Sequence, residues 1–133
     1  MKIKNLPSFK ELEIVENRHP DREYEISISV PEFNCVCPKT GLPDFANIQI
    51  RYIPNKSIVE LKSLKLYMVK FRNVGIYHEY VTNIILDDFR NACNPKSITV
   101  VGDFHPRGGI KTTITTKIPK LDKEYFESIS FFK

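Results

Sequence analysis

The order in which hydrophobic side chains repeat along this chain places the tightest limit on its fold. Near the N-terminal third, apolar residues recur at every second position in two separate segments. These residues are Tyr24, Ile26, Ile28 and Val30 in the first segment, and Ile48, Ile50 and Tyr52 in the second. A repeat of two is that of a strand with one buried face, so both segments are predicted strands.

The repeat changes to a helical one in the middle of the chain. From Val59 to Asn73 the apolar positions follow one helix face, and a second stripe begins after Gly75 and stops before Pro95. The first stripe is Leu64, Tyr67, Met68 and Phe71; the second is Val81, Ile84, Ile85, Phe89, Ala92 and Cys93. Two consecutive helices are predicted, and the second should carry Cys93 into the core.

Alternation returns after Pro95. Ile98 and Val100 begin a third predicted strand, and residues 110–118 alternate strongly enough for a fourth. Arg107-Gly108-Gly109 is the expected hairpin tip between them. The order ββααββ predicts an α+β fold, with a four-stranded antiparallel sheet and both helices on one face. A chain of 133 residues fits a single domain, 1–133.

Composition narrows the class of protein. No apolar run reaches the length of a membrane span, and the N-terminal residues lack an apolar signal core, so a cytoplasmic protein without a membrane partner is expected. Three cysteines indicate no disulfide framework. The net charge of +4 is spread among acidic residues, which favours solubility and some attraction for phosphates.

A thiol and a carboxylic acid stand at the ends of a turn-rich segment, Cys37-Pro38-Lys39-Thr40-Gly41-Leu42-Pro43-Asp44. A thiolate can add to an electrophilic carbon while a nearby acid supplies a proton to the heteroatom. The charge of Lys39 is expected to favour the thiolate. Taken alone, Cys37 is more often a small buried hydrophobe than a nucleophile, and Asp44 is more often a turn or strand-start residue than a catalytic acid.

This segment resembles the nucleophile loop of the NADPH-dependent 7-cyano-7-deazaguanine reductases, the nitrile reductases of the queuosine pathway. Three further segments are similar to those of the family, in the same order along the chain. They are Val59-Glu60-Leu61-Lys62-Ser63-Leu64-Lys65-Leu66-Tyr67, the pair His78-Glu79, and Pro106-Arg107-Gly108-Gly109-Ile110. The resemblance therefore runs from about Pro31 to Ile110.

The resemblance implies the tunnelling fold (T-fold). In that fold, subunits join their sheets edge to edge into rings, the rings stack, and the active sites lie between subunits. It also implies a homo-oligomer that acts on a small 7-deazaguanine, with NADPH as co-substrate, no required metal and no direct nucleic-acid partner. Closure into a ring would pair the two edges that a four-stranded sheet leaves open.

Each site residue has an implied role. Cys37 adds to the nitrile carbon and forms a thioimide, Asp44 protonates the nitrogen, and His78 serves in substrate binding or proton delivery. Asp44 has to be protonated at that step, so burial under the substrate should raise its pKa. The implied substrate-binding residues are Val59, Glu60, Leu61, His78 and Glu79. Lys62, Lys65 and Arg107 are the implied contacts for NADPH phosphates, since no Gly-x-Gly-x-x-Gly sequence is present.

Other interpretations stay open on the residues alone. Glu60 and Glu79 could be helix-start carboxylates, and Lys62 and Lys65 could lie on a solvated helix face. The main alternative function is a zinc-dependent pterin-forming enzyme of the same fold, which would need a cysteine and histidine metal shell. A non-catalytic RNA-binding module is a further alternative, although the tyrosines are dispersed and no basic aromatic strand motif is visible.

Overall fold

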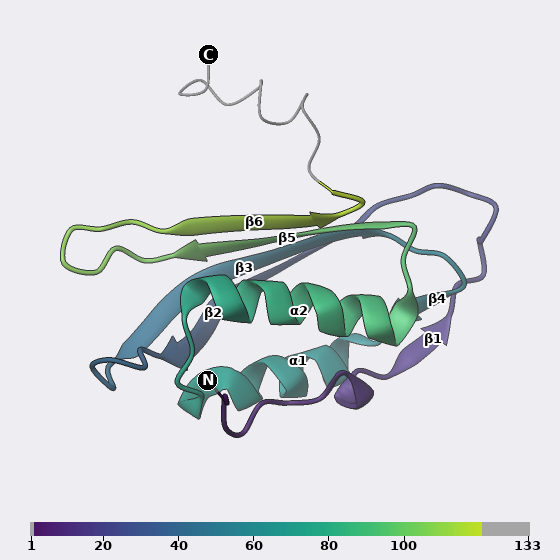
Figure 1. Cartoon of the computed structure of the whole chain (residues 1–133). Helices are drawn as coiled ribbons and strands as arrows, with labels where there is room; N and C mark the ends of the chain where they lie inside the picture. Colours follow the sequence, from purple (N-terminus) through teal and green to yellow (C-terminus); the bar gives the residue numbers. More distant parts are fainter. Residues whose placement is uncertain (1, 121–133) are drawn as a thin grey trace, which may run out of the picture.

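The computed structural model describes residues 2–120 and has an α+β architecture. Four strands form an antiparallel sheet in the order β2-β3-β5-β6. Their bounds are β2 Ile26–Val36, β3 Pro43–Ile53, β5 Ser97–Phe104 and β6 Thr113–Ile118. The helices α1 (Leu61–Val69) and α2 (His78–Cys93) lie on the same face of this sheet (Figure 1). The predicted ββααββ order is confirmed for the main sheet.

A second, smaller sheet was not predicted. Strand β1 (Ile14–Glu16) pairs antiparallel with β4 (Ser57–Val59), and short 3-10 helices cover Phe9–Glu11 and Lys70–Asn73. Strands of three residues are too short to produce a recognisable repeat, which explains why the sequence pattern missed them. Among the described residues, no helix is both long enough and apolar enough to cross a membrane.

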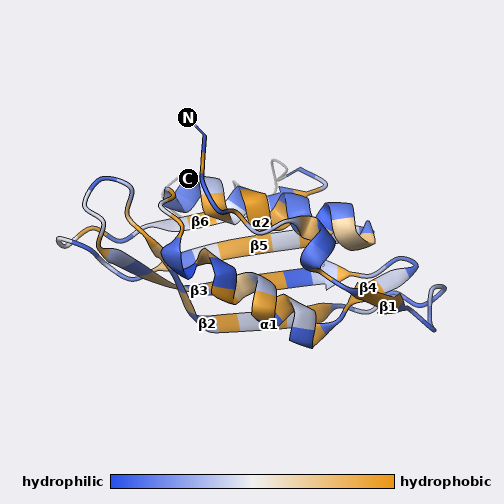
Figure 2. Cartoon of the chain, turned by 90° about the horizontal axis from the view of Figure 1, so that it is seen from below, coloured by the Kyte–Doolittle hydropathy of each residue, from blue (hydrophilic) through white to orange (hydrophobic). Residues whose placement is uncertain are grey.

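The core lies between the helices and one face of the sheet. Along β3 every second side chain from position 44 is buried: Asp44, Ala46, Ile48, Ile50 and Tyr52. Figure 2, which looks onto the helix-bearing face, shows hydrophobic and hydrophilic segments alternating along the strands. Since successive side chains of a strand point to opposite faces, this alternation buries one face and leaves the other polar.

Both helical stripes face the core as predicted, with Ile84 and Ala92 only partly buried. In α1 and the 3-10 turn that follows it, Leu64, Tyr67, Met68 and Phe71 are at most 5% exposed. In α2 the buried positions are Val81, Thr82, Ile85, Leu86, Phe89 and Cys93. Helix α2 ends at Asn94, which adopts the left-handed conformation that favours helix termination. Cys93 is therefore a core residue, in agreement with the prediction.

Several predicted boundaries were wrong. The first strand begins at Ile26 rather than at Tyr24. The first strand continues beyond Val30 to Val36, with irregular pairing around Pro31. Val59 belongs to β4 rather than to the first helix, because α1 starts at Leu61. Asp44 lies within β3, so the connecting loop is shorter than the turn-rich sequence indicated.

The fourth strand begins at Thr113, not at Ile110. Arg107 and Ile110 instead exchange two backbone hydrogen bonds of 2.9 and 3.0 Å across a tight turn. Gly108 and Gly109 occupy its centre with φ angles of +58° and +79°. Two successive positive φ values are favoured only by residues such as glycine, so the predicted hairpin tip is confirmed.

Candidate active site

Three segments far apart in the sequence enclose a pocket of about 270 Å³. They are the turn between β2 and β3, the start of α2, and the tight turn between β5 and β6. The residues that line the pocket are Cys37, Pro38, Thr40, Asp44, Ile76, Tyr77, His78, Glu79 and Arg107. Five of them, Cys37, Asp44, His78, Glu79 and Arg107, were singled out from the sequence.

Backbone hydrogen bonds join the first two segments. The N–H of Val36 donates to the carbonyl of Val74 at 2.9 Å, and the N–H of Ile76 donates to the carbonyl of Val36 at 3.0 Å. Val36 and Gly75 thus form a parallel bridge at the end of β2. This bridge brings the residue after Val36, which is Cys37, beside the residues that lead into α2.

The turn that begins at Cys37 stabilises its thiolate. Its ends are joined by hydrogen bonds from the Cys37 N–H to the Leu42 carbonyl and from the Gly41 N–H to the Cys37 carbonyl, at 2.8 and 2.9 Å. The Thr40 hydroxyl, together with the backbone N–H groups of Thr40 and Lys39, lowers the pKa of the Cys37 thiol. We expected the ammonium charge of Lys39 to have this effect, but Lys39 contributes its backbone N–H instead.

The other two cysteines differ in their chemistry. Cys35 is fully buried on the core face of β2, and this burial raises the pKa of its thiol to about 12. Burial likewise raises the pKa of Cys93 to about 11. A thiolate is the reactive form of cysteine. At neutral pH, Cys37 is therefore the best nucleophile of the three.

Asp44 is buried among polar partners. It is 5% exposed and faces the helices because it shares its side of β3 with Ala46 and Ile48. Arg107 Nη1 donates to Asp44 Oδ1 at 2.7 Å, and also to the Pro43 carbonyl. His78 Nε2 lies 3.1 Å from Asp44 Oδ2. The carboxyl group is thus linked both to a guanidinium and to an imidazole that can carry a proton.

His78 and Glu79 occupy the first turn of α2. His78 is the first residue of the helix, and its ring is partly buried, whereas Glu79 is exposed at the pocket. The preceding residue, Tyr77, also lines the pocket and adds an aromatic ring suited to contact with a flat heterocycle. Tyr77 and Thr40 were not singled out from the sequence. For Tyr77, the available signal was an aromatic residue directly before the His78-Glu79 pair.

The remaining predicted residues lie elsewhere in the chain. Glu60 caps α1: its carboxylate accepts the N–H groups of Lys62 and Ser63 at 2.7 and 2.8 Å. These two hydrogen bonds lower the pKa of Glu60. The side chain of Val59 is buried, while its N–H is 3.1 Å from the hydroxyl of Tyr52. Lys62 and Lys65 are exposed on α1.

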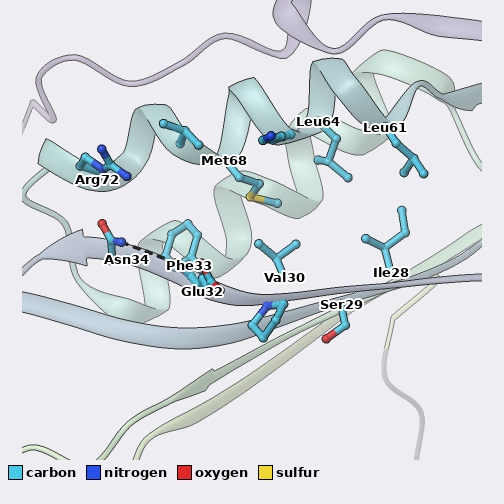
Figure 3. A pocket seen from close by; sticks show the side chains of 13 residues that line it. Ile28, Ser29, Val30, Glu32, Phe33, Asn34, Leu61, Leu64, Met68 and Arg72 are labelled. Atoms are coloured by element: carbon cyan, nitrogen blue, oxygen red, sulfur yellow. Dashed lines mark hydrogen bonds between the residues drawn. The ribbon is translucent and has the colours of Figure 1, made fainter.

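Leu61 and Lys65 line a larger pocket of about 520 Å³, which runs between α1 and β2. Figure 3 shows Leu61 beside Ile28 at one end of this groove and Arg72 beside Asn34 at the other, with Leu64 and Met68 pointing from the helix toward the strand. The start of α1 is therefore near the beginning of β2, whereas Cys37 follows the end of β2. Within one chain, the predicted residues form two separate sets.

Within residues 2–120, no three histidine, cysteine, aspartate or glutamate side chains are grouped in a way that could hold a metal ion. The pocket around Cys37 combines a stabilised thiolate, a buried carboxyl group, an imidazole and an exposed carboxylate. This combination suits nucleophilic addition to an unsaturated carbon, with proton transfer to the neighbouring atom.

Known proteins resemble this chain closely. The family described as QueF-like protein matches residues 43–123. A "NADPH-dependent 7-cyano-7-deazaguanine reductase" of Thermomicrobium roseum is 56% identical over 108 residues, which are 81% of this chain and 84% of the relative. A protein of the same name from Chlorobaculum tepidum is 52% identical over 109 residues, or 82% and 93% of the two chains.

A solved structure, "Crystal structure of the archaeosine synthase QueF-Like in the apo form", has the same fold. Its TM-score is 0.65 at 18% identity, and the match covers 75% of this chain and 96% of the solved one. This likeness confirms the predicted α+β tunnelling fold of the single chain, and assembly into rings stays a prediction. The sequence identities, the family match and the resemblance of the four sequence segments agree, and the chain belongs to the NADPH-dependent 7-cyano-7-deazaguanine reductase family.

Proposed function

We propose that this protein reduces the nitrile of 7-cyano-7-deazaguanine to an aminomethyl group with NADPH, as a step in queuosine biosynthesis for tRNA. The observation that carries the proposal is the pocket in which Cys37, with its lowered thiol pKa, lies with the buried Asp44. The names of relatives more than 50% identical support the same substrate and the same reductant.

The first step is covalent. The Cys37 sulfur forms a bond to the nitrile carbon, one π bond of the carbon–nitrogen triple bond breaks, and the nitrogen takes a proton from Asp44. The product is a thioimide. For this step Asp44 must hold a proton, and His78 supplies one through the contact between Nε2 and Oδ2. The undecided role of His78 is therefore assigned to proton delivery, with substrate contact as a second role.

The reduction uses two NADPH, each of which supplies one hydride to the same substrate carbon. After the first, the carbon–sulfur bond breaks, the Cys37 thiolate leaves, and an imine remains bound. The second converts the imine into the amine. Two protons are consumed overall, and the imine must be kept from water between the two steps. The chain's own residues thus activate the nitrile and deliver protons without a required metal.

Substrate recognition is assigned to carboxylates. A deazaguanine presents an exocyclic amine and ring N–H donors on one edge, and carboxylate oxygens accept such donors. Glu79 is exposed at the pocket and suits this role. His78 adjoins it, while Val59, Glu60 and Leu61 are proposed to contact the base from another subunit.

Cationic side chains are assigned to NADPH. Lys62 and Lys65 lie one turn apart on the exposed face of α1, and Arg107 reaches the pocket from the glycine-containing turn after β5. Their charges fit phosphate groups. In the structure Arg107 is bonded to Asp44, so we propose that it also orients the acid.

The two separate sets of residues support an active site shared between chains. Strands β2 and β6 are the two edges of the sheet, and the groove beside β2 carries the exposed apolar side chains Leu61 and Val69. We propose that β2 of one copy pairs with β6 of the next to close a ring, and that rings stack. The start of α1 then meets the Cys37 pocket of a neighbouring subunit.

The whole chain, 1–133, acts as one domain in this cytoplasmic assembly. The apolar character of the tail residues Tyr125, Phe126, Phe131 and Phe132 predicts, from the sequence alone, contact with a neighbouring subunit, but these residues lie outside the described part of the chain.

Mass spectrometry of the protein mixed with the nitrile, without NADPH, tests the proposal. We expect an adduct heavier by the whole substrate, which is absent in Cys37→Ala and present in Cys35→Ala. Added NADPH should then discharge the adduct, with two equivalents oxidised for each nitrile. Normal NADPH consumption by Cys37→Ala would refute the covalent mechanism.

Two other results would favour the alternative functions. One zinc ion per chain, required for activity, would favour the pterin-forming enzyme. Tight tRNA binding without nitrile reduction would favour the RNA-binding module.

A further inference from the structure

Gly102 leaves room for a close contact between α2 and the sheet. This glycine is buried in β5, and a Cβ atom at its position would lie 2.4 Å from Thr82 Oγ1 and 3.0 Å from Phe104 Cε1. Real Cβ atoms essentially never approach another atom within 3.0 Å, whereas ordinary contacts begin at 3.4 Å. A side chain at position 102 would therefore displace the Thr82 hydroxyl by about 1 Å, either by moving the helix turn or by rotating the hydroxyl away from the His78 carbonyl.

Thr82 links this contact to His78, the proposed proton donor. It is fully buried, and its hydroxyl donates to the carbonyl of His78 at 2.8 Å, one helical turn earlier. This hydrogen bond lies within α2, so a shift of Thr82 against β5 would be transmitted to the helix turn that bears the imidazole. The Tyr77 side chain makes no capping hydrogen bond at the start of this helix.

Phe104 fixes the plane of the imidazole. Its ring is fully buried and lies parallel to that of His78, with 3.7 Å between the ring centroids and 5° between the planes. Phe104 is two residues beyond Gly102 in β5, so both point to the helix-bearing face. With its plane fixed in this way, the imidazole directs Nε2 toward Asp44 Oδ2.

We propose that Gly102, Thr82 and Phe104 form a positioning unit for His78. The unit sets the distance of the His78 ring from the sheet and the plane of the ring, so that Nε2 stays within hydrogen-bond reach of Asp44. The functional part of this inference rests on the proton-delivery role proposed for His78. The three residues touch neither substrate nor cofactor in this scheme, and they act only through His78. A displacement of about 1 Å in a catalytic group can reduce turnover by about 100-fold.

A pair of opposing substitutions tests the unit. Gly102→Ala introduces the clash, and Thr82→Ala removes the hydroxyl that it would meet, so the double variant should relieve the clash. We expect Gly102→Ala to lower kcat by at least about 10-fold with little change in KM for the nitrile. The double variant should recover most of this loss. The single Thr82→Ala variant is the matched control, because it removes the hydroxyl without introducing the clash.

A second readout reports the position of His78 independently of catalysis. Protons held over the face of an aromatic ring resonate upfield, so the ring protons of His78 should be shifted upfield by Phe104. The chain has three histidines, and His78→Gln assigns the signal. We expect Gly102→Ala to abolish the shift and the double variant to restore it. Phe104→Leu, which keeps an apolar side chain but has no ring, should abolish it as well.

The outcomes separate this inference from the proposed function. An unchanged His78 signal in Gly102→Ala, or a double variant that recovers neither signal nor kcat, would overturn the positioning unit. If Gly102→Ala does not fold, the double variant and Phe104→Leu still test the positioning unit through kcat and the His78 signal. If the wild-type protein forms no nitrile adduct, the proposed function fails, while the NMR comparison still tests how His78 is held.

Discussion

Replacing Asp44 with asparagine removes a charge from the centre of the pocket while keeping the shape of the side chain. The carboxyl group is linked to Arg107 at 2.7 Å and to His78 Nε2 at 3.1 Å, and its side chain is 7% exposed. Asparagine retains an acceptor oxygen but cannot carry an acidic proton. We therefore expect two separate effects, one on the free energy of unfolding and one on the rate of adduct formation.

The size of the stability effect follows from burial. Breaking a fully buried ion pair costs about 3–5 kcal/mol. The side chain of Arg107 is 38% exposed, so water can solvate the released guanidinium and reduce that cost. A charged hydrogen bond contributes about 1.5–3 kcal/mol, and we expect the free energy of unfolding to fall by about 2 kcal/mol. With a urea dependence of about 2 kcal/mol per molar, the midpoint should fall by about 1 M.

Urea unfolding at equal chain concentration measures this change, and Asp103→Asn is its matched control. Asp103 pairs with Lys111 on the surface, where both side chains are about half exposed, so its loss should cost about 0–1 kcal/mol. In the mass-spectrometric assay, Asp44→Asn should form the nitrile adduct about 100-fold to 10,000-fold more slowly. Adduct formation at the wild-type rate would remove Asp44 from the acid role, and a midpoint no lower than that of Asp103→Asn would refute the ion-pair argument.

Two further predictions concern the thiolate and the assembly. Thr40→Val removes the hydroxyl that contributes most to the lowered pKa of Cys37, so the pH midpoint for alkylation of Cys37 should rise. Thr40→Ser keeps a hydroxyl at this position, so its pH midpoint should stay near that of the wild-type protein. Because the folded pKa is the lower one, the thiolate favours folding above the unfolded pKa, and this contribution disappears as the pH falls through the folded value. Val69→Glu puts a charge in the groove beside β2 at a residue that is 46% exposed in the single chain, so light scattering should show smaller particles without loss of helix content. Leu66→Glu, at a 55% exposed residue outside the groove, should leave the particle size unchanged, and equal effects of the two substitutions would contradict the proposed interface.

Some properties of the active site were visible in the sequence because they depend on residue types and short spacings. Cys37, Asp44 and the His78-Glu79 pair stand in segments that resemble those of the family, and all of them line one pocket. The proposed chemistry needs a nucleophile, an acid and a carboxylate that binds the base, and such groups can be recognised from residue type alone. The contacts that adjust them were not predicted: Thr40 was not singled out, and Arg107 was assigned to NADPH rather than to Asp44. Both meet their partners through turns whose geometry a linear pattern does not encode.

The sequence by itself determined which faces of the strands and helices are buried. Repeats of two and of 3.6 residues arise from backbone geometry within each element, so Ile48, Ile50, Leu64 and Val81 could be assigned to the core before any contact was known. The hairpin at Gly108 and Gly109 is equally local, since it requires only two residues that accept positive φ.

Only the tertiary structure decided which of these elements become neighbours. The bridge between Val36 and Gly75 brings Cys37 to the start of α2, and the absence of a side chain at Gly102 lets Thr82 and His78 settle onto β5. The tertiary structure also separates Glu60 from the Cys37 pocket within one chain. Such contacts join residues that are tens of positions apart, and they depend on how whole elements pack, which a local repeat does not specify.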